Sequence, residues 1–427
     1  MSALIIFGIL IVLMLTGMPI SISLGLTVLT FLFTLTEVPV ESVALKLFTG
    51  IEKFEIMAIP FFILAGNFLT HGGVARRMIN FASSMVGHLY GGLALAGILA
   101  CALFAAVSGS SPATVVAIGS ILLPAMVKQG YPKSFGVGVI GTAGGLGILI
   151  PPSIAMVIYA VSTNSSIGKL FIAGVVPGLL LALVLMGVTW VYARKKAFPR
   201  QPKASWAQRW QYLRECFWGI FLIVVVMGGI YSGIFTATEA AAMSALYAFV
   251  VALFVYKDIG WKQVPKVLLD SANMSAMLLY IITNAVLFSF LLTSENIPQD
   301  LAARISGQGL SPWMFLLVVN ILLLVAGNFM EPSSILLITA PILFPVAMAL
   351  GIDPTHLGIL MVVNMEIGMI TPPVGLNLYV SSGIAKMGLT DVTKACAPWI
   401  LVMIAYLMLV TYVPAISLWL PKTLGMM

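Results

Sequence analysis

Two clusters of serine, threonine and asparagine interrupt the apolar sequence and offer oxygen ligands to a cation. The first runs from Ser108 to Thr114, and the second runs from Gly327 to Ser334. Hydroxyl and carbonyl oxygens are hard ligands of the kind that Ca²⁺ and Mg²⁺ prefer, and the same logic suits Na⁺. Helix ends at such clusters also present N–H groups to an anion. Both clusters are therefore candidate sites for Na⁺ that could hold an anion beside it.

Each cluster is followed along the chain by a segment in which glycines precede a double proline. Pro151-Pro152 lies in segment 144–153, and Pro372-Pro373 lies in segment 368–377. Two prolines remove two backbone donors and clash with the preceding turn, so neither helix can run through its segment without a break. Unwound backbone of this kind exposes carbonyls to an ion. The residues expected to ligate Na⁺ are Ser108, Gly109, Ser110, Ser111, Gly144, Gly147, Asn328, Glu331, Ser333, Thr371 and Gly375.

A purely structural interpretation exists for each of these residues. Serine and threonine in membrane helices often only bond neighbouring backbone or join helices, and a double proline alone is more often a kink than a site. The argument for a site comes from the occurrence of the same two features twice.

The composition places these motifs in a membrane. Hydrophobic residues make up 61% of the 427 residues and charged residues only 8%, against about 25% charged in soluble proteins. Such a chain could not cover a soluble surface, which excludes a soluble enzyme, a nucleic-acid binder and a disordered chain. The cysteines Cys101, Cys216 and Cys396 lie far apart in or beside apolar segments, and we expect them to be buried. The apolar sequence at the N-terminus reads as a retained helix instead of a signal peptide.

Apolar segments predict ten crossings, because a span needs about 20 apolar residues. They are 3–17, 18–36, 56–70, 134–164, 168–193, 216–233, 236–256, 276–294, 354–385 and 396–420. The polar clusters are flanked by apolar arms that are each too short to span, at 93–107, 115–127, 313–326 and 335–350. These arms predict re-entrant hairpins at about 92–127 and 312–350. Segments 37–55, 72–90 and 258–276 are amphipathic and could lie along the membrane surface as arms.

The two sets of features recur at one spacing. Pro124 and Pro345 are 221 residues apart, as are Gly147 and Gly368 and the two double prolines. The chain is therefore expected to be two repeats, 1–196 and 218–427, joined by a basic linker, 197–217. Each repeat has a hairpin and a broken helix (134–164 and 354–385), and its five crossings would invert the second repeat relative to the first.

The positive charges set the orientation. With both termini outside, 16 of the 21 Lys and Arg residues fall inside, as the positive-inside rule requires. The basic residues left outside are Lys46, Lys53, Lys169, Arg304 and Lys422. The first hairpin then opens toward the cytoplasm and the second toward the exterior.

Three acids lie within or beside apolar segments and need separate interpretations. Glu239 most simply completes a helix cap with Thr236 or Thr238. Glu331 or Glu366 could carry a transported proton, so proton coupling stays open. His71, His88 and His356 are expected at the surface. An intramembrane serine protease is disfavoured because Gly109-Ser110-Ser111 has no partner base within a plausible helix.

The whole chain resembles the large membrane subunit, or permease, of the tripartite ATP-independent periplasmic (TRAP) transporters of the C4-dicarboxylate type. The matching motifs are Ala65-Gly66-Asn67, Ser108 to Thr114, Gly147 to Ser153, Gly233 to Ala242, Gly327 to Ser334 and Thr371 to Asn377. One departure is Ala237, where the family commonly has proline, and this affects only the local helix cap.

The resemblance implies an all-α polytopic membrane protein, an inverted-repeat, elevator-type transporter like those of the ion transporter superfamily, and not an enzyme. It implies import of an organic acid coupled to two or more Na⁺. The partners implied are a small four-helix membrane subunit and a periplasmic solute-binding protein, in the bacterial inner membrane. A scaffold of 1–90 and 215–310 would hold a transport domain of 91–194 and 311–427. Substrate would lie near Ser111, Thr114, Pro152, Ser153, Ser334, Pro373 and Asn377.

Two alternatives remain open at the level of the sequence. The chain could be a stand-alone transporter coupled to protons or Na⁺, or a passive anion channel.

Overall fold

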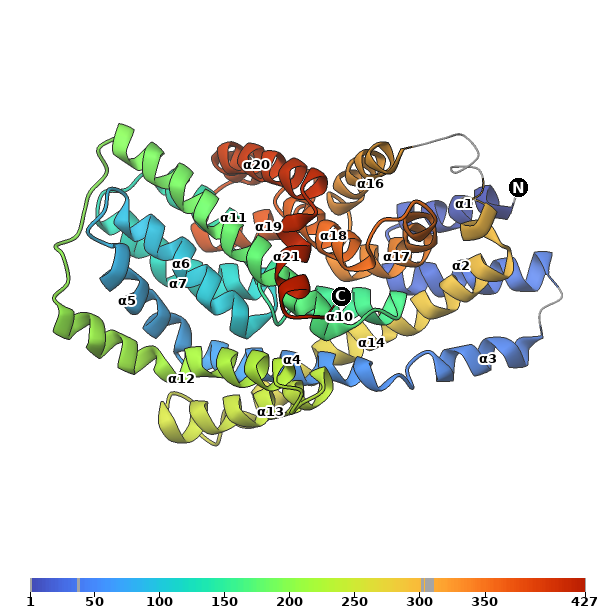
Figure 1. Cartoon of the computed structure of the whole chain (residues 1–427), viewed down its shortest axis with the longest axis horizontal. Helices are drawn as coiled ribbons and strands as arrows, with labels where there is room; N and C mark the ends of the chain where they lie inside the picture. The colour runs from blue at the N-terminus through green and yellow to red at the C-terminus, as the bar shows by residue number, and fades with distance from the viewer. Residues whose placement is uncertain (1, 37–38, 301–302, 304–310, 427) are drawn as a thin grey trace.

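The computed structural model describes residues 2–36, 39–300, 303 and 311–426, and this part of the chain is helical with no strand. Its first half holds α1 (Ser2–Leu15), α2 (Ile20–Leu35), α3 (Val40–Thr49), η1 (Phe54–Met57), α4 (Ala58–His71), α5 (Val74–Val86), α6 (Gly92–Ser108), α7 (Ser111–Lys128), α8 (Lys133–Ala143), α9 (Leu146–Leu149), α10 (Ile154–Thr163) and α11 (Ile167–Lys195). Its second half holds α12 (Trp206–Tyr231), α13 (Ala237–Val250), η2 (Val251–Val255), α14 (Val264–Ser294), α16 (Pro312–Gly327), α17 (Pro332–Ala349), α18 (Pro354–Gly368), α19 (Leu376–Ala385), α20 (Leu389–Tyr412) and α21 (Ala415–Thr423). Figure 1 shows these helices along the chain.

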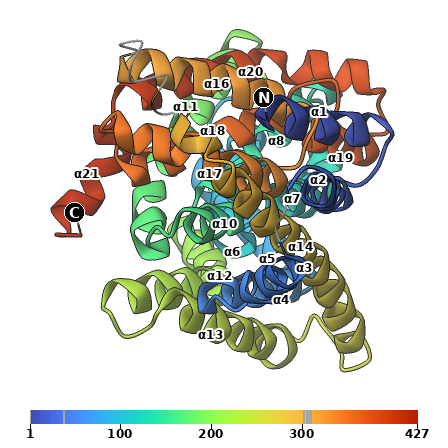
Figure 2. The same ribbon diagram turned by 90° about the vertical axis from the view of Figure 1, so that its right-hand side faces the viewer.

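The helix boundaries repeat at the spacing found in the sequence. Helix α7 begins at Ser111 and α17 at Pro332, and α8 begins at Lys133 and α18 at Pro354, so each pair of starts is 221 residues apart. Both helical hairpins, α6–α7 and α16–α17, and both broken helices are present. Helices α10, α17 and α18 contact one another and lie near the middle of the molecule in both views (Figures 1 and 2).

The second arm of each hairpin is longer than the sequence suggested. We expected arms of 115–127 and 335–350, but α7 and α17 each have 18 residues because residues of the polar clusters continue the helix. Pro112 and Pro332 stand in the first turn of these helices, where a missing N–H breaks no bond within the helix. The expectation that both arms are too short to span was therefore wrong for the second arms.

The helices long and apolar enough to span a membrane also differ from the ten predicted segments. Among the described residues, eight helices are long and apolar enough to cross a membrane, or nine when the bent pair Lys133–Leu149 and Ile154–Thr163 is one span. Helices α1 and α2 have only 14 and 16 residues, because Gly17 at a φ of +83° and Pro19 separate them. The eight include α7 and α17, which we had assigned to the hairpins.

The second repeat lacks the separate amphipathic arm expected at 258–276. One continuous helix, α14, which begins at Val264, covers most of this stretch and the whole span predicted at 276–294. In the first repeat, Gly50 and the charged Glu52 and Lys53 separate α3 from η1. The corresponding stretch 271–274 contains no glycine and no charge, so nothing there interrupts the helix. The arm predicted at 72–90 forms a separate helix, α5.

The last predicted span, 396–420, has different bounds in the structure. Helix α20 starts earlier, at Leu389, and ends at Tyr412, and the short α21 follows. Pro414 stands directly before α21, and a proline at that point removes the backbone donor needed to continue α20.

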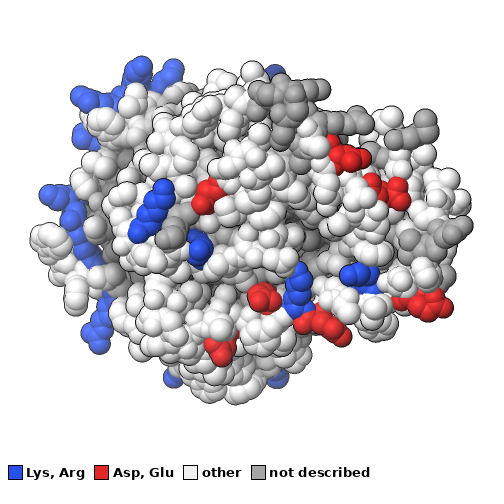
Figure 3. Space-filling model, turned by 45° about the vertical axis from the view of Figure 1, so that its right-hand side comes forward, with Lys and Arg blue, Asp and Glu red and all other residues white. Residues whose placement is uncertain are grey.

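Positive charge gathers toward one end of the molecule (Figure 3). The last turn of α11 carries Arg194 and Lys195, and the connection from α11 to α12, at the left of Figure 1, carries Lys196, Arg200 and Lys203. Under the positive-inside rule this end would face the cytoplasm, which stays a prediction. Arg304, which we expected on the opposite side, lies outside the described residues.

Candidate functional site

The first polar cluster forms the turn between α6 and α7. Helix α6 ends at Ser108, Gly109 turns the chain at a φ of +60°, and Ser110 precedes α7. The Ser108 and Thr114 hydroxyl oxygens are 2.9 Å apart, and the Thr114 hydroxyl also donates to the Ser110 carbonyl at 2.8 Å. Both side chains are buried. The oxygens of the first tip, residues 108–114, are thus hydrogen-bonded to one another in this structure.

This tip lies against the broken helix of its own repeat. A Cβ on Gly147 would stand 2.6 Å from the Ser110 carbonyl oxygen, and a Cβ on Gly109 would stand 3.0 Å from the Pro152 carbonyl oxygen. Both glycines therefore allow backbone approaches that no other residue could make. The first break runs from Gly144 to Ser153, as the sequence predicted.

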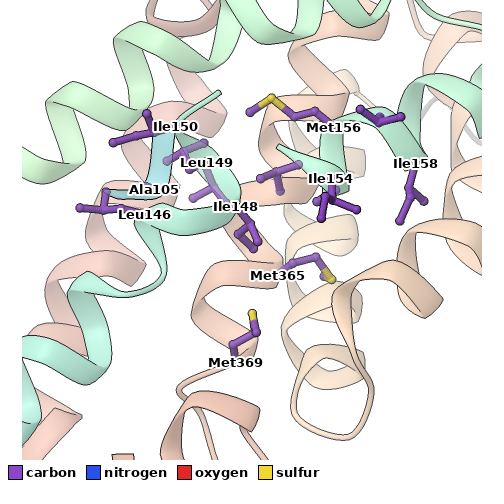
Figure 4. Close-up of a cluster of buried hydrophobic side chains, with 14 of the residues drawn as sticks. Ala105, Leu146, Ile148, Leu149, Ile150, Ile154, Met156, Ile158, Met365 and Met369 are labelled. Atoms are coloured by element: carbon purple, nitrogen blue, oxygen red, sulfur yellow. The ribbon is translucent and has the colours of Figure 1, made fainter. Parts of the chain in front are cut away.

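Ser153 has a structural role within this break. Its hydroxyl donates to the Ile148 carbonyl at 2.5 Å and accepts from the Met156 N–H at 3.4 Å, which caps α10. Apolar side chains close the break from one side. Figure 4 shows Leu146, Ile148 and Ile154 of the first broken helix packed with Met365 and Met369 from the second.

The second tip and the second break meet in the same manner. The Val374 N–H donates to the Asn328 carbonyl at 3.1 Å. A Cβ on Gly327 would stand only 3.0 Å from the Cα of Gly368. Thr371 donates its hydroxyl to the Ile367 carbonyl at 2.7 Å, and Gly375 takes a φ of +53° at the start of α19.

The two breaks differ in exposure. Pro151, Pro152 and Ser153 are buried, whereas Pro372, Pro373 and Val374 are exposed. The repeats are therefore similar in sequence pattern but occupy unequal environments in this conformation.

One hydrogen bond connects the two repeats at the site. The Asn377 side-chain amide, at the second break, donates to the Ser111 hydroxyl of the first tip at 2.7 Å, and both side chains are fully buried. The side-chain oxygens of Asn377 and Asn328 have no hydrogen-bond partner in the described part of the chain. Leaving a buried oxygen without a hydrogen-bond partner costs about 1–3 kcal/mol of folding free energy. Both oxygens are therefore suited to bind a cation.

The remaining predicted residues lie on the second tip. Glu331 precedes α17 without a side-chain cap bond, and Ser333 and Ser334 are buried in its first turn. Across the residues described, no three His, Cys, Asp or Glu side chains gather as metal ligands.

The sequence analysis did not single out two buried asparagines, and it misplaced one buried histidine. Asn364 donates to Asn320 at 2.7 Å, and Asn320 donates to Thr411 at 2.8 Å, so a buried polar chain joins α18, α16 and α20. Single asparagines in apolar helices were the available signal. His356, expected at the surface, is buried and lies 2.8 Å from the Ser417 hydroxyl, because α21 folds back over α18.

Glu366 occupies a special position between the repeats. Its side chain is fully buried, and neither carboxyl oxygen has a hydrogen-bond partner among the described residues. A Cβ on Gly145 would stand 2.6 Å from its Oε1, and Gly145 is the residue 221 positions earlier. Equivalent residues of two repeats can touch only near the axis that relates the repeats. Glu366 and Gly145 therefore lie near this axis. Glu239, in contrast, forms a capping box with Thr236, as expected.

Comparisons with known proteins identify the family of this chain. Residues 7–416 match the family described as tripartite ATP-independent periplasmic transporter, DctM component. The chain belongs to this family.

Relatives cover the full length. The C4-dicarboxylate TRAP transporter large permease protein DctM of Rhodobacter capsulatus is 71% identical, over 100% of both chains. The protein of the same description from Pseudomonas aeruginosa is 57% identical over 95% of each. The crystal structure of the Alcanivorax borkumensis YdaH transporter has a TM-score of 0.63 at 16% identity, covering 92% of this chain and 89% of that one, which shows a shared fold.

These findings confirm two expectations. The chain is a multi-pass TRAP transporter large permease subunit with the fold expected from the sequence, and its relatives are transporter subunits, not enzymes.

Proposed function

We propose that this permease subunit imports an organic acid, a C4-dicarboxylate, together with Na⁺. The observation that carries this proposal is the hydrogen bond between Ser111 and Asn377, which joins the tip of one repeat to the break of the other. Helix ends that meet inside the membrane build ion and solute sites in many secondary transporters. The substrate class is supported by the printed names of relatives that are 71% and 57% identical.

Na⁺ ligands are proposed at both tips and both breaks. They are Ser108, Gly109, Ser110, Ser111, Gly144 and Gly147 in the first repeat and Asn328, Glu331, Ser333, Thr371 and Gly375 in the second. The side-chain oxygen of Asn377 is added to this set, because it is buried and without a partner in the described structure. The Ser108 and Thr114 hydroxyls, now bonded to each other, can rotate toward a cation.

The acid is proposed to lie between these ions, beside Ser111, Thr114, Pro152, Ser334, Pro373 and Asn377. Ser153 was expected in this group as well, but its hydroxyl is occupied in capping α10, so we propose it as a residue that positions the break. The positive ends of α7, α17, α10 and α19 would favour the carboxylates.

Transport is proposed to proceed by an elevator motion. Residues 91–194 and 311–427, which contain the hairpins and broken helices, would move against a scaffold of 1–90 and 215–310. The contacts between tips and breaks support this division, because they tie these elements into one packed unit.

We further propose that the subunit works in the bacterial inner membrane with both termini in the periplasm. A small four-helix membrane subunit and a periplasmic solute-binding protein would complete the tripartite system after which the family is named. Positive charge on the α11–α12 linker supports this orientation.

Uptake of labelled succinate, a C4-dicarboxylate, into proteoliposomes tests the proposal. The assembled membrane subunits with the binding protein should accumulate succinate only under an inward Na⁺ gradient. Full uptake without that gradient would indicate a channel, and uptake driven by a pH gradient in Na⁺-free buffer would indicate proton coupling. Uptake by this chain alone would indicate a stand-alone transporter. Any of these results would contradict the proposed mechanism.

A further inference from the structure

A cavity lies between α3 and α14 on one side and α10 and α17 on the other. Its volume is about 290 Å³, close to the lower end of the roughly 300–1,000 Å³ typical of small-molecule pockets. Figure 2 shows these four helices next to one another. The cavity thus lies between elements that the proposed function assigns to the scaffold and elements it assigns to the moving unit.

Two lysines give this cavity its charge. Lys46 and Lys53 line it together with the hydroxyl side chains Ser162, Ser289 and Thr293, and no acidic residue contributes to its wall. Among the described residues, the ion pair within 4.0 Å is that of Arg77 with Asp258, so neither lysine has a carboxylate partner there. Two ammonium groups facing one cavity without a counter-charge attract an anion.

The lysines differ in how they are held. Lys53 donates to the Val161 carbonyl at 3.0 Å and to the Asn164 side-chain oxygen at 2.8 Å, at the carboxyl end of α10. Lys46 stands 5.3 Å from the centre of the Phe290 ring and is exposed. Lys46 is therefore the more accessible ammonium group, whereas Lys53 uses two of its three N–H donors on the wall and keeps the third for a solute.

We propose that this cavity is an outer binding site for a small dicarboxylate, with Lys46 and Lys53 binding its carboxylates. The inference rests on the proposed function for its substrate, and on the proposed orientation, which places both lysines on the periplasmic side. An imported acid would occupy this cavity before it reaches the hairpin tips. A lipid phosphate offers the same anionic chemistry, so the test must separate the two sources.

Protection of Lys46 from acylation measures binding directly. The assembled membrane subunits, in nanodiscs of phosphatidylcholine without binding protein, are treated with an amine-acylating reagent at rising succinate concentrations, and mass spectrometry follows each lysine. Succinate should slow acylation of Lys46 but not of Lys169, which is also predicted on the outer side and does not line the cavity. Equal rates with and without succinate would overturn the proposal. A second set of nanodiscs contains anionic lipid. If this lipid slows acylation of Lys46 and succinate does not, the proposal is also overturned, because a lipid headgroup would then be the occupant.

Transport kinetics give an independent test. Lys46→Gln should raise the succinate concentration for half-maximal uptake by roughly tenfold, which corresponds to about 1.4 kcal/mol, without changing the maximal rate. Lys46→Arg should restore binding, and Lys169→Gln is the matched control. Equal effects of the two glutamine variants would indicate general surface charge and overturn the proposal. Failure of the proposed function would instead appear as no Na⁺-dependent uptake by the unmodified assembly.

Discussion

The amide of Asn377 donates to the hydroxyl of Ser111 at 2.7 Å, across 266 residues of sequence. Ser111 begins the second arm of the first hairpin, and Asn377 lies in the first turn after the second break. Because of this contact, a movement or substitution at either residue changes the hydrogen bonding of the other repeat. It also places an asparagine oxygen without a described partner beside the tip at which a cation is proposed.

A double-mutant cycle should detect this contact. Ser111→Ala and Asn377→Leu each remove one partner of a buried hydrogen bond, and we expect each to destabilise the protein by about 1–3 kcal/mol. Because they remove the same bond, the double variant should lose less than the two single losses added together. Thermal unfolding of the purified protein measures the change. Strict additivity would show that the two side chains do not interact.

Gly147→Ala should displace the first hairpin tip. The added Cβ would meet backbone atoms of Ser110 at 2.6 Å, and backbone cannot turn aside as a flexible side chain can. Overpacking of this kind typically destabilises by about 1–3 kcal/mol, and uptake should fall with it. Gly187→Ala is the matched control, because nothing lies within 4 Å of its Cβ. Normal uptake by Gly147→Ala would mean that tip and break do not pack closely.

Gly368→Ala tests the corresponding contact in the second repeat. Its Cβ would stand 2.7 Å from the Cα of Gly327, so we expect a similar loss of stability and of Na⁺-dependent uptake. Gly383→Ala, in the helix that follows the second break, has open space around its Cβ and should be neutral or stabilise by about 0.4–1 kcal/mol. The unfolding temperature should therefore fall in Gly368→Ala and stay level or rise in Gly383→Ala; an equal fall in both variants would contradict the geometry.

Arg77→Ala should loosen α5 from the end of η2. The Arg77 guanidinium pairs with Asp258 and lies 3.8 Å from the centre of the Tyr256 ring. Both members of the ion pair are partly exposed, so we expect a loss of only about 1 kcal/mol in stability. Arg76→Ala, at an exposed neighbour, is the control. Equal unfolding temperatures for the two variants would show that the Arg77 contacts contribute nothing.

Repetition in the sequence predicted the two hairpins and the two broken helices that carry the proposed site. The equal spacing of Pro124 and Pro345, and of the two double prolines, indicated two copies of one fold, and the starts of α7 and α17 confirm it at the same spacing. Proline and glycine act locally on the backbone, so their consequences can be read without the tertiary structure.

Contacts between the repeats could not be read in this way. The Ser111–Asn377 bond and the approach of Glu366 to Gly145 depend on how the two copies pack, which no local rule fixes. The length predicted for the helix at 276–294 was wrong for a related reason. Whether stretch 258–276 forms a separate arm depended on a glycine that the first repeat has at Gly50 and the second lacks.

Na⁺ titration of succinate uptake tests the central claim, that the two tips share one centre for Na⁺ and the acid, most directly. Ser111→Ala and Ser334→Ala, one in each repeat, should both raise the Na⁺ concentration for half-maximal uptake by several-fold, while Ser120→Ala, on the exposed side of α7, should leave it unchanged. An unchanged Na⁺ dependence in both tip variants would contradict the account.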